Sequence, residues 1–94
     1  MKMLMKKFGD ILISRPAGRE AFLAASAYSL PKGWETMDLE LDFENVPVVA
    51  PSWLDEFLSG LCSKNKGTIV IKSHGNQSLI ESCHVIEWPI QLVE

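Results

Sequence analysis

The most regular pattern along the chain lies between residues 36 and 44, where apolar and acidic side chains alternate. The apolar positions are Met37, Leu39, Leu41 and Phe43, and the acidic positions are Asp38, Glu40, Asp42 and Glu44. A period of two predicts a β-strand with one apolar face and one acidic, solvated face. Because a strand covered by helices on both faces would be apolar throughout, we expect a sheet covered mainly on one face.

Two later segments also have the pattern of strands. Residues 67–73 (GTIVIKS) place Ile69 and Ile71 on one face, and residues 86–92 alternate around Pro89. Proline has no N–H group to donate to a neighbouring strand, so the last strand is expected at an edge of the sheet.

The N-terminal residues contain two short extended candidates. Residues 2–8 and 11–14 are mostly apolar or basic, and Gly9 and Asp10 separate them. This arrangement predicts a small β-hairpin.

Three segments have the apolar periodicity of helices. In the first, Pro16 lies near the start, with Ser14 or Arg15 as the cap. Its expected apolar face consists of Ala17, Ala21, Phe22, Ala25 and Tyr28. The last helix, residues 76–85, is expected to begin at a cap formed by Asn76 or Ser78.

The central helix has a wide apolar stripe of Trp53, Leu54, Phe57, Leu58 and Leu61. Ser52 stands just before this stripe, and the spacing from Ser52 to Asp55 matches a variant of the capping box, which predicts Ser52 as the N-cap. The same serine is a candidate phosphoacceptor. A phosphate at a helix N-terminus is tolerated by the helix dipole and adds about two negative charges.

These elements predict a single α/β domain over residues 1–94, built from βαβ crossovers with a mixed sheet and helices packed mainly on one face. The net charge of −3 argues against nucleic-acid binding, which needs a basic surface. No apolar run approaches the roughly 20 residues of a membrane span. The two cysteines are too few for a disulfide scaffold, and we expect a cytoplasmic protein with free thiols.

Few residues have the spacing of a catalytic or metal-binding motif. Cys62, His74, Cys83 and His84 lack the spacing of a zinc site, and Ser52 lies in no nucleophile elbow. The loop KSHGNQS has neither of the common phosphate-binding patterns. We therefore expect no metal, no cofactor and no catalytic residue. The alternative is a small ligand-binding domain or enzyme that uses the loop around His74.

The segment LDFENVPVVAPSWLDEFLSGL, with SRPAGREAF before it and GTIVIKS after it, resembles small STAS-like domains related to anti-sigma factor antagonists. The matching residues are Leu41, Asp42, Phe43, Val46, Ser52, Trp53, Asp55, Glu56 and Phe57, with Arg15 or Arg19 before the first helix. The resemblance implies a sheet backed by helices. In that group a serine at the start of the helix is phosphorylated by a partner kinase, and Ser52 occupies the similar position.

We therefore expect a non-catalytic regulatory domain that binds another protein. The expected binding surface is the N-terminal end of the central helix: Pro51, Ser52, Trp53, Asp55 and Glu56. Trp53 is expected to expose its ring as an interface anchor. The partner implied by the resemblance is an ATP-binding kinase of the anti-sigma type. A homodimer through the edge strand near Trp88 is a further alternative.

Overall fold

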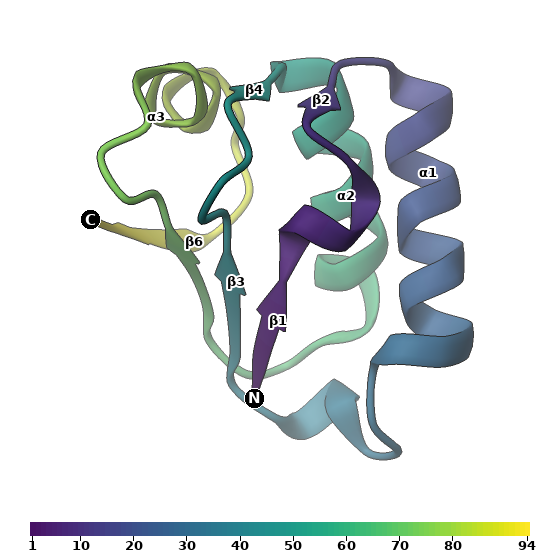
Figure 1. The fold of residues 1–94 in the computed structure, drawn as a ribbon. Helices are drawn as coiled ribbons and strands as arrows, with labels where there is room; N and C mark the ends of the chain where they lie inside the picture. The colour runs from purple at the N-terminus through teal and green to yellow at the C-terminus, as the bar shows by residue number, and fades with distance from the viewer.

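The computed structural model describes residues 1–94 and contains a parallel four-stranded sheet (Figure 1). The strands β1 (Lys2–Leu4), β3 (Leu39–Asp42), β5 (Ile69–Lys72) and β6 (Ile90–Val93) are neighbours in that order. Every neighbouring pair is parallel. The α/β class is confirmed, and the expected mixed sheet is in fact parallel. β6 lies at an edge, as Pro89 predicts.

Three helices connect the strands: α1 (Arg15–Ala24), α2 (Pro51–Lys64) and α3 (Gln77–Val85). Each helical connection joins one strand to its neighbour in the four-stranded sheet, always in the same direction across the sheet. Because such crossovers are right-handed, their helices lie on one face of the sheet. Figure 1 shows the sheet in front, with α2 behind it and α1 beside α2. The prediction of a sheet covered mainly on one face is confirmed. None of the helices combines the length and hydropathy that a membrane span requires.

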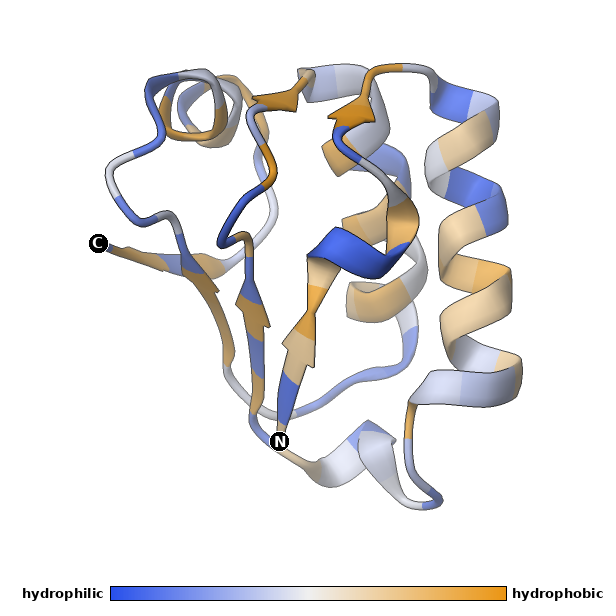
Figure 2. Ribbon diagram, viewed as in Figure 1, coloured by the Kyte–Doolittle hydropathy of each residue, from blue (hydrophilic) through white to orange (hydrophobic).

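The core lies between the sheet and α2. The strands contribute the buried side chains of Met3, Leu39, Leu41, Ile69 and Ile71, and α2 contributes those of Trp53, Leu54, Phe57, Leu58 and Leu61. Figure 2 shows the matching hydropathy, with apolar segments on the strands and along α2. The apolar faces of β3 and β5, which follow from a period of two, form one side of the core, and the apolar stripe of α2, which follows from the helical period, forms the other.

The predicted N-terminal hairpin is wrong. After β1 the chain forms a 3-10 turn at Met5–Phe8, and then β2 (Ile11–Leu12) pairs in parallel with β4 (Val48–Val49) as a separate two-stranded ribbon. The turn brings Met5 into the core and places the Phe8 ring 5.6 Å from that of Phe57. The free energy gained by burying these side chains outweighs the free energy of the local hairpin that a turn at Gly9 and Asp10 would allow.

The buried face of α1 also differs from the predicted one. Gly18, Ala21 and Ala25 are buried, whereas Ala17 is exposed and Tyr28 is 90% exposed. A π-helical turn at Ala25–Ser29, closed by a 2.8 Å bond from Leu30 N–H to the Ala25 carbonyl, rotates Tyr28 away from the core. The cap is Ser14, whose hydroxyl accepts a hydrogen bond from Ala17 N–H.

Candidate functional site

The N-termini of α1 and α2 lie side by side because the ribbon of β2 and β4 leads into both helices. Ile11 pairs with Val48 and Leu12 with Val49, and Ala50 N–H donates to the Leu12 carbonyl at 2.8 Å. The chain enters α1 at Arg15 and α2 at Pro51 directly after these strands. The expected partner-binding segment therefore stands next to the start of α1, which is far from it in sequence.

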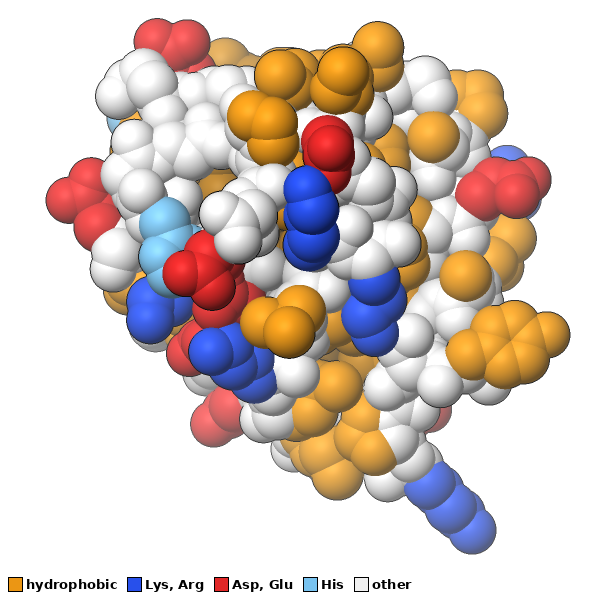
Figure 3. All heavy atoms as spheres, in the orientation of Figure 1, with side chains coloured by type: hydrophobic (Ala, Val, Ile, Leu, Met, Phe, Trp, Pro, Cys, Tyr) orange, Lys and Arg blue, Asp and Glu red, His pale blue; other side chains and the backbone are white.

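Three exposed apolar side chains cover the outer side of this ribbon, and we call them the apolar row: Ile11, Ile13 and Val48. Their exposed fractions are 64%, 54% and 39%, whereas Leu12 and Val49 on the opposite side are buried. Figure 3 shows hydrophobic side chains gathered at the top of the molecule, where Figure 1 places β2 and β4. Sequence analysis missed the row because Val48–Val49 is too short for a period of two, although Ile11 and Ile13 alternate around Leu12.

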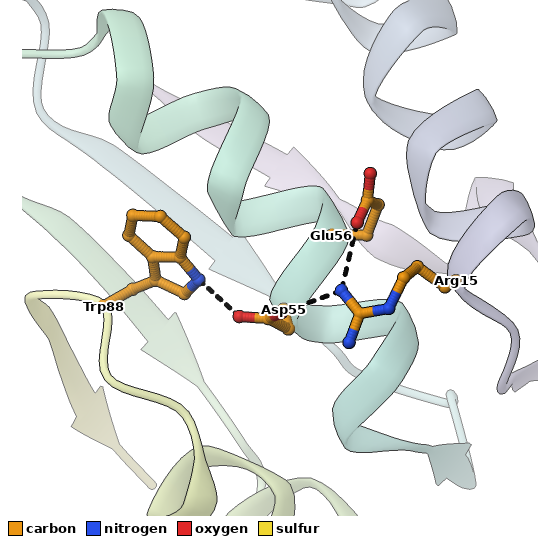
Figure 4. A network of polar contacts seen from close by, with 4 residues as sticks. All are labelled: Arg15, Asp55, Glu56 and Trp88. Carbon is orange, nitrogen blue, oxygen red and sulfur yellow. Dashed lines mark hydrogen bonds and ion pairs between the residues drawn. The ribbon is translucent and has the colours of Figure 1, made fainter.

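A polar network joins the start of α1, the first turns of α2 and the loop after α3 (Figure 4). Arg15 Nη1 lies 2.8 Å from Asp55 Oδ2 and 3.0 Å from Glu56 Oε2. Trp88 Nε1–H donates to Asp55 Oδ1 at 2.7 Å. The hydrogen bonds from Arg15 and then Trp88 lower the pKa of Asp55, and those to Asp55 and Glu56 raise the pKa of Arg15. Both carboxyl oxygens of Asp55 are occupied within the chain.

A pocket of about 490 Å³ lies beside this network. Its walls include Arg15, Ser52, Asp55, Val85, Glu87 and Trp88. Sequence reasoning did not connect Trp88 and Glu87 with α2, because both lie beyond α3 in the chain, in the connection to β6.

Ser52 is not the helix cap. α2 begins at Pro51 with Ala50 as the N-cap residue, and no side chain makes the capping hydrogen bond. Proline has its backbone pre-set for the first helical position, and this moves the helix start ahead of the serine. The predicted capping box with Asp55 is therefore wrong. Ser52 is exposed in the first turn.

The expected exposure of Trp53 is also wrong. Its side chain is 1% exposed, and its ring is stacked on that of Phe57 at 5.1 Å with an angle of 8°. The tryptophan belongs to the apolar stripe of α2, which faces the core. Of the other predicted residues, Pro51 is exposed, whereas Asp55 and Glu56 are half-buried and bound to Arg15.

A second polar centre surrounds Asp42, which was predicted to be solvated but is 2% exposed. Its Oδ1 lies 2.6 Å from His74 Nε2 and accepts from Glu44 N–H at 2.9 Å, and its Oδ2 lies 3.2 Å from Lys2 Nζ. Burial alone would raise the pKa of Asp42, but the hydrogen bonds from Glu44, His74 and Lys2 outweigh it and lower the pKa. The acidic face of β3 is thus not uniformly solvated, because the loop after β5 covers its end.

A polar pocket of about 590 Å³ adjoins this centre and is lined by Asn45, His74 and Asn76 among others. Asn45 and His74 both have left-handed backbone conformations, with φ of 63° and 53°. The pocket lies where β3 and β5 end, and in open parallel sheets ligands bind outside the carboxyl ends of the strands.

The cysteines offer no reactive thiolate. Burial raises the pKa of Cys83 to about 11 and also raises that of Cys62. A thiol with a raised pKa is a poor nucleophile at neutral pH. Comparisons of the chain with protein-family models, curated proteins and solved structures find no match.

Proposed function

We propose that the chain is a non-catalytic regulatory domain that binds another protein through the apolar row and the start of α2. The observation that carries the proposal is the position of Ile11, Ile13 and Val48, which are exposed beside Pro51 and Ser52. A group of exposed apolar side chains with a polar rim is typical of protein–protein interfaces. The row takes the anchoring role that sequence analysis gave to Trp53.

Ser52 is the proposed switch of this surface. Its hydroxyl is exposed at the second position of a 14-residue helix and makes no capping bond, so it is free for modification. A phosphate there is stabilised by the positive end of the helix and changes the local charge by about −2. The charge of the partner then decides whether phosphorylation strengthens or weakens binding.

The resemblance to STAS-like domains supplies the proposed class of partner. It implies an ATP-binding kinase of the anti-sigma type that acts in the cytoplasm. The fold supports this proposal in two respects: the sheet is covered mainly on one face, and Ser52 follows the central strand at the start of the next helix. The proposal is that such a kinase both binds this surface and modifies Ser52.

The test is affinity capture with the wild-type chain and three variants whose folding is checked by circular dichroism. Ile13→Ser removes one member of the apolar row, and Leu23→Ser is the matched control because Leu23 is 56% exposed on α1. Ser52→Asp mimics the modified state. A specific protein that is captured by wild type and Leu23→Ser, lost with Ile13→Ser and changed in amount with Ser52→Asp supports the proposal. Equal capture by Ile13→Ser and wild type contradicts it, and a second copy of this chain as the captured protein indicates a homodimer instead.

The pocket beside His74 favours a second candidate function, the binding of a small polar ligand. Its lining is polar, and the buried carboxylate of Asp42 orients the His74 ring at its edge. A thermal-shift screen with polar metabolites tests this function. Ligands that stabilise wild type but not His74→Ala support it, whereas equal stabilisation of both proteins places the ligand elsewhere.

A further inference from the structure

The pocket beside Trp88 has an excess of negative charge. Arg15 is the one cation that lines the pocket, and the carboxylates that line it are Asp55 and Glu87. Glu56, which Arg15 also contacts, lies outside the lining. The charges of the lining residues therefore sum to −1, and Glu56 brings the sum to −2. Glu87 is exposed and takes part in none of the ion pairs of the chain.

This charge selects the kind of ligand that the pocket accepts. The N-termini of α1 and α2 each contribute about half a positive charge, and their sum of about one unit does not reverse the charge of −2 carried by the lining and Glu56 together. Arg15 contacts Asp55 and Glu56 through Nη1, so an anion bound to its other N–H groups would still lie close to these two like charges. A cation can form an ion pair with Glu87 while the contacts of Asp55 with Arg15 and Trp88 stay in place.

The walls of the pocket fit a cation that has an apolar stem. Trp88 is half-buried and presents its indole, while Val85 and Pro51 add apolar surface. Arginine and lysine side chains bury their methylene groups against such walls, and a guanidinium stacks on an indole ring. We infer that the pocket accepts an arginine or lysine side chain from the partner protein.

The pocket is continuous with the surface of the proposed function, because Ser52 belongs to both. This inference rests on that function and names the partner's chemistry: a basic side chain in the pocket next to an apolar side chain on the apolar row. It also fixes the sign of the switch. A phosphate on Ser52 adds negative charge to the pocket, so phosphorylation strengthens the contact with a basic side chain.

The test is an NMR titration with N-acetyl-arginine methylamide as the probe. N-acetyl-citrulline methylamide is the matched control ligand, since it has nearly the same shape without the charge. The reporters are the Trp88 indole N–H and the Glu87 and Ser52 amides. We expect saturable shifts with the arginine probe, with binding weakened about two- to fivefold by Glu87→Gln and strengthened by a similar factor by Ser52→Asp.

Glu81→Gln is the matched control variant, because Glu81 is exposed on α3 but does not line the pocket. It is expected to bind the probe as wild type does. Equal shifts with the citrulline compound, or unchanged affinity in Glu87→Gln, would overturn the inference. The titration uses no partner protein, so a negative titration does not contradict the capture experiment. In the same way, a negative capture experiment does not contradict the titration.

Discussion

Alanine at position 18 is expected to destabilise the protein although alanine is the better helix former. Gly18 is buried in α1, and a Cβ atom added there would lie 2.4 Å from the carbonyl oxygen of Trp53. That oxygen belongs to the backbone of α2, so the clash is relieved only by moving one helix relative to the other. Replacing glycine by alanine in a helix gains about 1 kcal/mol, whereas overpacking costs about 1–3 kcal/mol. Because the contact is with backbone, we take the upper value and expect a net loss of about 2 kcal/mol.

Urea unfolding followed by tryptophan fluorescence measures this loss, which corresponds to a fall of roughly 10 °C in Tm for a domain of this size. Gly60→Ala is the comparison variant. Its Cβ atom would also meet atoms at 2.4 Å, Cδ2 and Cγ of Phe22, but these belong to a half-buried side chain that can move about its Cα–Cβ bond without a shift of backbone. Gly60→Ala should therefore be the milder change. If Gly18→Ala unfolds at the same urea concentration as wild type or a higher one, the close approach of α1 and α2 does not limit the packing as we argue.

The remaining predictions concern caps, the core and acid stability. Ser14→Ala should lower the unfolding free energy by about 1 kcal/mol, and Ser52→Ala should change it by less than about 0.5 kcal/mol, because only Ser14 makes a capping bond. Equal losses in urea unfolding would show that Ser52 is a cap after all. Trp53→Ala should cost about 3–5 kcal/mol in the same assay, and a variant that folds as stably as wild type would mean that the ring is not core. Stability should also fall with acid, because the pKa values of Asp42 and Asp55 in the folded state lie below the ordinary 3.8. Their contribution is present above that value and is lost as the pH falls through the folded-state pKa values. Thermal unfolding at decreasing pH measures this loss, and Asp42→Asn should show less of it than wild type.

The sequence predicts the elements whose periodicity is long and regular. Leu39 and Leu41 in β3, Ile69 and Ile71 in β5, and the stripe of α2 from Leu54 to Leu61 face the core as their spacing requires. These patterns are local, and one buried face is enough to fix the type of element. The edge position of β6 was predictable for a similar reason, since Pro89 removes one backbone donor just before the strand.

The remaining features depend on partners that are distant in sequence. Asp42 has the alternation of a solvated acidic face, but its burial depends on His74, which is 32 residues away. Trp53 lies in the first turn of α2, where spacing alone does not say whether a side chain reaches the core, and Phe8 and Phe57 complete its surroundings. Ser52 is not the cap because of one local feature: Pro51 sets the start of α2 one residue before the serine.

The two candidate sites share one segment of backbone, residues 43–50, which α3 and the loop before it hold in place. Asn76 Nδ2–H donates to the Val46 carbonyl at 2.6 Å, and Ser82 Oγ–H donates to the Val49 carbonyl at 2.6 Å. Since Val49 is the last residue of β4 before the start of α2, these bonds help to set the position of Val48 and Ser52. His74 lies two residues before Asn76 and is itself bound to Asp42 at the other end of the segment. A displacement of the His74 loop is therefore expected to move Asn76 and, through its hydrogen bond to the Val46 carbonyl, the backbone that leads to Val48.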